Sequence, residues 1–334
     1  MRVSISGSDK FNQHSNNNIN KNGAPSSPGR IPRSTPNHFN KIRASFNSRI
    51  MPSRVILIRH GQSEGNANSA IYSTKPDPDL NLTSVGWQQA IECGKALKNS
   101  VLTEGESVHF VVSPYVRTME TFHGVLRAYA DPGEIGLAEG EEEDERTNKW
   151  YKELEKKHNI TFHEDPRIRE QDYGNYQNEE EMRKFKMERN KYGPFYYRFP
   201  HGESASDVYD RVSTFLDSLW RSFEAQKARN YVIVTHGAAI RVLLTRYFRY
   251  TVDEYNRLTN PSNGEIISLC HDGEGKLTLE GRVELTYGKG EGGAGGGGGG
   301  EVARTITGYK WHKSLSCWKR EKAKKRKVNL PPMI

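Results

Sequence analysis

The sequence predicts a three-layer α/β sandwich with a mostly parallel central sheet. The run at 54–58 is apolar without alternation, which indicates a strand buried on both faces. Similar apolar runs follow at 108–112 and 231–235, and segments with helical spacing lie between them. Strands that alternate with helices from 54 to 270 form a parallel sheet covered by helices on both sides.

Each element has its own signal. Thr83 is a typical helix cap, and Leu82 ahead of it is a candidate staple residue. Ser204-Ala205-Ser206-Asp207 is a capping-box pattern that opens an amphipathic helix. The expected elements in order are strand 54–58, helix 83–97, strand 108–112, helix 115–129, a short helix 150–157, strand 160–162, helix 204–223, strand 231–235, helix 238–248 and closing strands 266–269 and 277–279.

The composition indicates that only part of the chain is packed. Only 34% of the 334 residues are apolar, and the mean hydropathy is −0.82, which is too polar for a core of that length. We therefore expect four regions. They are a disordered basic arm over 1–53, a folded domain over 54–282 with an acidic surface insertion at about 133–146, a Gly-rich linker over 283–308, and a basic tail over 309–334.

The positive charge lies outside the predicted folded domain. The chain carries a net charge of +8, of which residues 1–53 hold +7 and residues 301–334 hold +8, so the stretch between them is at −7. A nucleic-acid enzyme would carry basic residues on its folded body, so nucleic acid is an unexpected partner for this domain. We favour a solvated arm at 1–53 over a targeting segment. For the basic run 319–327 we favour a solvated tail over a nuclear address or a nucleic-acid or membrane patch.

Three widely spaced cysteines, Cys93, Cys270 and Cys317, form neither a zinc pattern nor a disulfide framework. No apolar run is long enough to cross a membrane, and we find no signal-peptide core. A cytoplasmic protein is expected, with nuclear or organellar targeting by the basic tails as the alternative. The oligomeric state stays open.

Two histidines stand at the ends of predicted strands. Arg59-His60-Gly61 follows the strand at 54–58, and Thr235-His236-Gly237 ends the strand at 231–235. Carboxyl ends of parallel strands meet at one edge of the sheet, where ligands bind. Two imidazoles at that edge, one beside an arginine, indicate chemistry on a phosphate.

The residue types fit attack on phosphorus. Neutral imidazole is a good nucleophile near pH 6–7, so His60 could take a phosphoryl group and divide hydrolysis into two steps. Guanidinium groups of Arg59 and Arg117 match the phosphoryl oxygens. His236 and the N–H groups of Gly237 and Ala238, at a helix start, are further expected donors. For Arg117, a structural pairing with Glu120 is the alternative.

The leaving group needs a proton, and Glu170 is the candidate donor, because neighbouring negative charge keeps a carboxyl protonated. Asp172 and Glu164 are alternatives. Asn66 has a second interpretation as a turn or cap residue, and His201 and Glu203 as residues that order a loop.

These residues lie in motifs that resemble the histidine phosphatase superfamily, in its phosphoglycerate-mutase-like branch. The six motifs, in order, are Arg59-His60-Gly61-Gln62-Ser63-Glu64-Gly65-Asn66, Leu82-Thr83-x-x-Gly86-x-x-Gln89-Ala90, Ser113-Pro114-x-x-Arg117-Thr118-x-x-Thr121, Ile168-Arg169-Glu170-x-x-x-Gly174, Pro200-His201-Gly202-Glu203-Ser204 and Thr235-His236-Gly237. They cover about residues 54–270, and within the family the sequence is most similar to small acid phosphatases of fungi and to plant mutase-like proteins.

The resemblance implies a role for each matching position. It makes His60 the phosphorylated histidine and Glu170 the proton donor, with Arg59, Asn66, Arg117 and His236 as phosphate ligands. Gln62, Ser63 and Gly237 are expected at the substrate as well. It implies a small phosphorylated substrate, with no metal and no other cofactor.

Three activities remain open at this point. A phosphatase is favoured over a phosphoglycerate mutase, because only 66 positions separate Glu170 from His236, and the glycolytic mutases carry a long insertion there. The aromatic and basic segment 185–199 lies in this interval and is a candidate cover for the site, with packing of 195–199 as the alternative. A non-enzymatic domain that binds a phosphorylated ligand is the third possibility.

Overall fold

The computed structural model describes residues 38–130, 143–175 and 178–283. Most of the predicted basic arm and acidic insertion, and nearly all of the linker and basic tail, lie outside the described residues. The chain divides into residues 1–41 and 42–334, and the description below concerns the second unit.

Six strands form one sheet in the order β3-β2-β4-β1-β5-β6. Their bounds are β1 Arg54–Arg59, β2 Val108–Val112, β3 Ile160–Glu164, β4 Asn230–Thr235, β5 Ile266–His271 and β6 Leu277–Val283. The first four are parallel to one another, and β5 and β6 are antiparallel additions at the β1 edge. The predicted mostly parallel sheet is confirmed.

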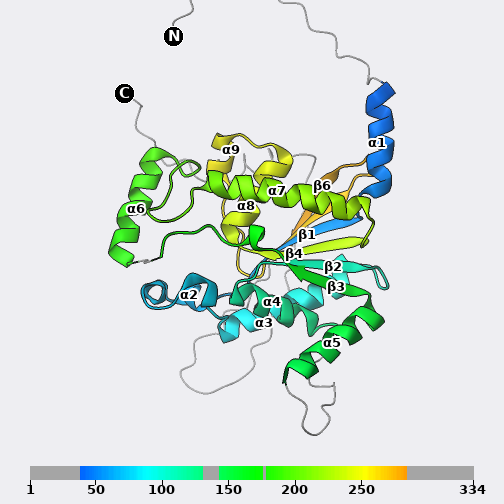
Figure 1. The fold of residues 1–334 in the computed structure, drawn as a ribbon, viewed down its shortest axis with the longest axis horizontal. Coiled ribbons are helices and arrows are strands. Elements are labelled where there is room, and N and C mark those ends of the chain that lie inside the picture. The colour runs from blue at the N-terminus through cyan, green and yellow to red at the C-terminus, as the bar shows by residue number, and fades with distance from the viewer. Residues whose placement is uncertain (1–37, 131–142, 176–177, 284–334) are drawn as a thin grey trace, which may run out of the picture. The chain divides into compact units, whose positions relative to one another are not determined.

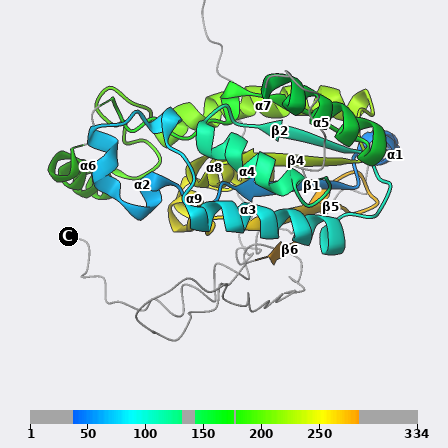
Figure 2. The same ribbon diagram turned by 90° about the horizontal axis from the view of Figure 1, so that it is seen from below.

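Helices cover both faces of the sheet (Figure 1). One layer contains α3 (Ser84–Ala96), α4 (Val116–Leu126) and α5 (Glu143–His158), and the other contains α7 (Ala205–Glu224), α8 (Gly237–Phe248) and α9 (Val252–Arg257). Figure 2 shows the sheet from the side of α3 and α4. The predicted three-layer sandwich is confirmed, although α9 was not predicted.

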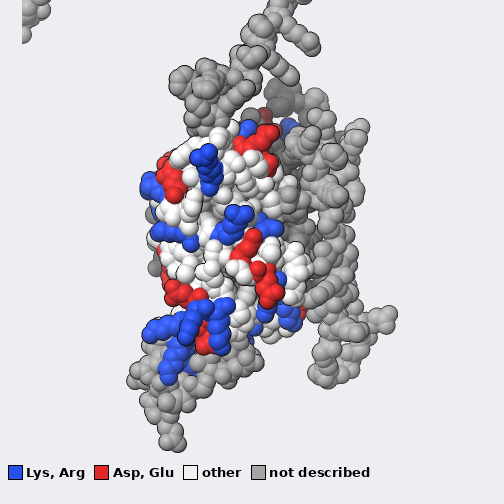
Figure 3. All heavy atoms as spheres, turned by 90° about the vertical axis from the view of Figure 1, so that its right-hand side faces the viewer, with Lys and Arg blue, Asp and Glu red and all other residues white. Residues whose placement is uncertain are grey.

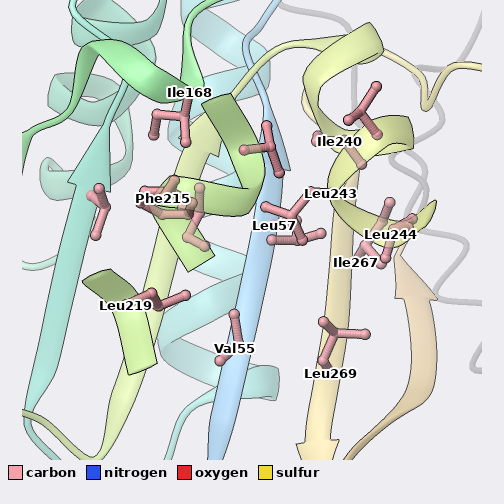
Figure 4. Packing of buried hydrophobic residues seen from close by; sticks show 14 of the residues in the cluster. Val55, Leu57, Ile168, Phe215, Leu219, Ile240, Leu243, Leu244, Ile267 and Leu269 are labelled. Carbon is pink, nitrogen blue, oxygen red and sulfur yellow. The ribbon is translucent and has the colours of Figure 1, made fainter. Parts of the chain in front are cut away.

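Alternating residues of β1 divide the core into two clusters. Val55 and Leu57 face the α7 and α8 layer, where Figure 4 shows Leu57 close to Leu243. Ile56 and Ile58 face the opposite cluster, with α3, α4 and α5. Every residue from 55 to 58 is apolar because both faces of β1 are buried.

Several short elements follow the strands at their carboxyl ends. They are α2 (Glu64–Ala67), η1 (Ser69–Ser73), η2 (Asp77–Asp79) and η5 (Pro166–Ile168), and η3 (Leu97–Val101) continues α3. Helix α6 (Glu179–Tyr192) lies at the same end of the sheet as α2 in both ribbon views. Ser69 of η1 donates a hydrogen bond to Glu179 at the start of α6 (2.5 Å). Neither α2 nor α6 was predicted.

The prediction of disorder over all of 1–53 is wrong for its last part. Residues His38–Ile50 form helix α1, in which Phe39, Ile42, Phe46 and Ile50 recur at helical spacing. Ile50 and Met51 are buried, and Ser48 donates to the carbonyl of Gly273 (2.8 Å). The end of α1 is therefore anchored through Ile50, Met51 and Ser48. In the ranges described, no helix has the length and apolar character needed to cross a bilayer.

Candidate active site

The register of β1 with β4 brings the two histidines together. Arg59 lies opposite Thr235, so the next residues of both strands are neighbours, and the His60 N–H donates to the Thr235 carbonyl (2.9 Å). The two imidazole centroids are 5.2 Å apart with the rings inclined by 61°. Both side chains are almost completely buried. Both can therefore contact one phosphoryl group.

The His60 ring has a fixed tautomer. Its Nδ1 lies 2.7 Å from the carbonyl oxygen of Gly61, which can only accept, so Nδ1 carries the hydrogen and Nε2 keeps its lone pair. Burial lowers the pKa of His60 well below its usual value, and the nearby Arg117 and Arg59 lower it further. The ring is thus held neutral, with the lone pair of Nε2 free.

The loop after His60 is tied to the helices behind it. The Gly61 N–H donates to Thr121 Oγ1 (3.0 Å), and Asn263 Nδ2 donates to the carbonyls of His60 and Gly61 (3.1 Å each). A Cβ on Gly61 would overlap the carbonyl of Gly86 in α3. Glycine is required here because two backbones approach within contact distance.

His236 is held differently. Its Nε2 forms a hydrogen bond with Ser113 Oγ (2.7 Å), and its buried Nδ1 has no partner among the described residues. His236 is also the N-cap residue of α8. Burial, then Arg117 and His60, lower its pKa well below the usual value. A free ring nitrogen at a helix start is available to an anion.

Two arginines complete the anion site. Arg59 donates through Nη1 to the carbonyl of Pro261 (2.7 Å), while its buried Nε has no partner in the described ranges. The Arg117 side chain is buried, lies over the ring of Tyr115 (4.9 Å) and pairs with Asp77. The alternative pairing of Arg117 with Glu120 is wrong, because Glu120 accepts from the Leu82 N–H and from Asn81.

Glu170 lies between η5 and the start of α8. Its Oε1 accepts from the Gln171 N–H (3.0 Å), and its Oε2 is 3.5 Å from the Ala238 nitrogen. Burial raises the pKa of Glu170 despite the two arginines, which favours a carboxyl that still holds its proton. The alternatives fit less well, because Glu164 is exposed and Asp172 accepts the Gly174 N–H in a turn (2.8 Å).

Arg211 of α7 supports the backbone of the Glu170 loop. It donates to the carbonyls of Arg167 (2.7 Å), Arg169 (2.9 Å) and Glu170 (3.0 Å). Glu203 accepts from Arg211 (2.9 and 3.1 Å) and from Arg169 (2.5 Å). The expectation that Glu203 orders a loop agrees with these contacts.

The predicted substrate contacts in the first motif separate into two groups. Ser63 is fully buried and caps α2, and Gln62 accepts from Thr83 Oγ1 (2.8 Å), so both have structural partners in place of the substrate. Asn66 is exposed, and its Oδ1 accepts from Asn263 (2.8 Å), which leaves its amide N–H groups without an acceptor in the described part of the chain. Gly237 opens α8 as expected, with the Asn260 amide packed against it.

In the segment 185–199, two aromatic side chains pack in the core and two others are exposed. Phe195 and Phe199 are buried, and Phe195 packs edge-on against Tyr255 of α9 (5.1 Å). Tyr192 and Tyr196 are exposed, so they remain available to a ligand.

Four groups at the site were not assigned a role from the sequence. Ser113 stood in a quoted motif, where its position at a strand end was an available signal. Asp77 and Asn263 arrive from loops distant in sequence, and no local pattern marks them. Burial raises the pKa of Tyr115 to about 12, so this neighbour of His236 (5.0 Å between rings) keeps its hydroxyl proton.

Comparison with known proteins agrees with this geometry. Residues 55–137 and 144–281 match the family model of the histidine phosphatase superfamily (branch 1). The phosphoglycerate mutase-like protein AT74 of Arabidopsis thaliana is 40% identical over 233 residues, which cover 66% of each chain. Its relative AT74H from the same plant is 41% identical over 242 residues, 68% of this chain and 77% of that protein.

A yeast protein is also similar. The broad-range acid phosphatase DET1 of Saccharomyces cerevisiae is 30% identical over 288 residues, covering 65% of this chain and 84% of DET1. The match thus spans just under two thirds of AT74 and a larger share of the other two relatives.

Proposed function

Because the chain belongs to the histidine phosphatase superfamily, we propose that it hydrolyses phosphate monoesters through a phosphohistidine on His60. One observation carries this proposal: the buried rings of His60 and His236 adjoin each other (5.2 Å between centroids), with Arg59 and Arg117 close to both rings and to Glu170. The names of AT74 and DET1 support a reaction at phosphorus.

In the first step, His60 Nε2 forms a bond to phosphorus while the bond from phosphorus to the ester oxygen breaks. Glu170 gives its proton to that oxygen, which leaves as an alcohol. Nδ1–H remains bonded to the Gly61 carbonyl, so the ring keeps its orientation as it gains the phosphoryl group. In the second step, Glu170 takes a proton from water, the hydroxide oxygen bonds to phosphorus, and the bond from phosphorus to His60 breaks.

Fixed donors stabilise the charge that the phosphoryl oxygens share in both steps. Arg59, Arg117 and His236 are held by backbone and side-chain contacts before substrate arrives. Preorganised donors of this kind supply a large part of phosphoryl-transfer catalysis. We propose that the reaction needs no metal, and activity should survive a chelator such as EDTA.

A small phosphorylated molecule is the proposed substrate, and nucleic acid remains an unexpected partner for the folded domain. On the face shown in Figure 3, basic and acidic side chains interleave without a field of one sign. Cys93 is a free, buried thiol, in keeping with the proposed cytoplasmic location. Imaging of the tagged full chain in its own cells tests that location.

The decisive experiment incubates the purified full chain with a panel of phosphate esters and measures released inorganic phosphate. Rapid acid-free quenching and peptide mass spectrometry should locate a phosphoryl group on His60, with the His60→Ala variant as control. Phosphoryl transfer to a phosphoglycerate, dependent on a bisphosphoglycerate primer and without free phosphate, would show a mutase. Binding of esters without any turnover would show a binding domain.

A further inference from the structure

Arg117 is held by a residue forty positions earlier in the chain. Its Nη1 donates to the backbone carbonyl of Asp77, and its Nη2 donates to Asp77 Oδ2 (3.3 Å). The second carboxylate oxygen, Oδ1, lies 3.1 Å from Nη1. The Arg117 side chain is 3% exposed and that of Asp77 is 17% exposed, so water competes little for this pair.

The contact uses one edge of the guanidinium. A guanidinium has an end edge formed by its two Nη groups and a side edge formed by Nε–H and one N–H of Nη2. Asp77 occupies the end edge. No other described residue accepts a hydrogen bond from Arg117, so the side edge keeps two parallel donors, the arrangement that binds phosphoryl oxygens in pairs.

The turn that carries Asp77 is built to hold one conformation. It reads Lys75-Pro76-Asp77-Pro78-Asp79, and a proline on each side of Asp77 restricts the backbone. At its base, Lys75 Nζ contacts Glu64 Oε2 (2.6 Å) and Asn81 Oδ1 (2.8 Å). Pro76, Pro78 and Asp79 are exposed, and only Asp77 turns inward.

We propose that Asp77 is a positioning residue for Arg117: it fixes the end edge of the guanidinium so that the side edge meets the phosphoryl group. This inference rests on the proposed function, because it assigns Arg117 to the phosphoryl oxygens. The opposite interpretation makes Asp77 a competitor that substrate must displace. The backbone carbonyl argues against that, because it cannot leave Arg117 unless the whole proline-flanked turn moves.

Arg59 shows the same principle with a neutral partner. Its Nη1 is held by the carbonyl of Pro261, and its Nε has no partner among the residues described. In both arginines a backbone oxygen holds Nη1 and leaves Nε for a ligand. The added carboxylate distinguishes Arg117, and its removal should loosen this guanidinium without removing its charge.

The test compares Asp77→Ala and Asp77→Asn with the wild-type chain. We expect kcat to fall by about 10–100-fold in Asp77→Ala, as for other lost supporting contacts, with a smaller change in KM. Calorimetric affinity for orthovanadate, which mimics the five-coordinate transition state, should fall by a similar factor, and affinity for inorganic phosphate should fall less. Asp77→Asn keeps an acceptor oxygen, so its kcat and its vanadate affinity should lie between those of Asp77→Ala and the wild-type chain. Asp79→Asn, in the same turn but exposed, should behave as wild type.

A double-mutant cycle with Arg117→Ala separates a positioning role from a general structural one. If Asp77 acts through Arg117, adding Asp77→Ala to Arg117→Ala should cost no further activity. Tighter phosphate and vanadate binding by both Asp77 variants would show a competitor and overturn the proposal, as would unchanged affinities. Vanadate binding needs no turnover, so a wild-type chain that hydrolyses no ester would refute the proposed function and leave this measurement intact.

Discussion

The carboxyl ends of β1 and β4 carry the same motif, a histidine followed by glycine, yet they hold the histidine in different ways. After β1, the His60 ring bonds to the carbonyl of its own neighbour, and the loop amides are taken by side chains from α3 and α4. After β4, the chain enters α8 at once, and the His236 ring bonds to Ser113 of a different strand end.

The difference separates two chemical tasks. A nucleophile needs one tautomer and a fixed direction of attack, and a bond to an obligate acceptor ensures both. A donor to phosphoryl oxygens benefits from the N-terminus of a helix. When the Ser113 hydroxyl donates to Nε2, the Nδ1 of His236 carries the hydrogen and can donate it to a phosphoryl oxygen. We therefore infer that the first region makes the bond to phosphorus and the second stabilises its charge.

The largest expected effect is at His60. His60→Ala removes the one protein atom that is proposed to bond to phosphorus, so turnover should be abolished. His236→Ala should leave a measurable rate. Released phosphate from a panel of esters measures both, and circular dichroism with thermal unfolding checks that the variants are folded. An equal loss of turnover in the two variants would contradict the assignment of different roles to the two strand ends.

Loss of the His236 side chain should have the next largest effect on the rate. Removal of one preorganised donor costs about 10²–10³ in rate, so kcat of His236→Ala should fall by that factor. Phosphohistidine on His60 should still form, more slowly, in a single-turnover experiment. A variant that forms none would show that both histidines take part in bond formation.

Glu170→Gln should affect esters according to their leaving groups. Alkyl phosphates need a proton and should lose more activity than activated aryl phosphates. The free enzyme needs neutral His60, whose pKa is lowered by burial, and protonated Glu170, whose pKa is raised by burial.

The pH dependence of wild-type kcat/KM follows from these two requirements. Activity should fall as pH drops through the lowered pKa of His60 and as pH rises through the raised pKa of Glu170, giving a bell-shaped profile. The alkaline limb should disappear for aryl esters in Glu170→Gln. Equal loss on both ester types would move the acid role to another group.

The smallest effect is expected from Ser113→Ala. This change removes one hydrogen bond from the His236 ring, worth about 1 kcal/mol net, so kcat should fall several-fold with little change in KM. Phosphohistidine formation on the same variant is the sharper measurement. A loss as large as that of His236→Ala would mean that Ser113 acts on the substrate itself.

The sequence predicted the parts of the site that depend on strand register. His60 and His236 follow apolar runs, and parallel pairing of those runs places both rings at one edge. Glu170 and Arg117 follow from motifs with local spacing. Ser113 lies in one of these motifs, but its contact with His236, 123 positions away, could not be predicted from it. Asp77 and Arg211 could not be assigned, because their partners lie 40 and 41 positions away and long-range side-chain contacts leave no periodic signal.

The fold was predictable to a similar extent. Buried strands and amphipathic helices have strong patterns, and the sandwich follows from them. Helices α1 and α6 were missed because polar residues dominate their sequences. Among the side chains described, Ile50 of α1 and Met182 of α6 are the buried apolar ones.

The overlap that a Cβ on Gly61 would make with Gly86 has a mechanical consequence. The main chains of Gly61 and Gly86 are in direct contact, with no side chain between them. In the proposed reaction, this contact keeps the loop that carries His60 from shifting toward α3 while the ring attacks phosphorus. Helix α3 contributes no reacting group to the proposed mechanism, but it supports the backbone that carries His60.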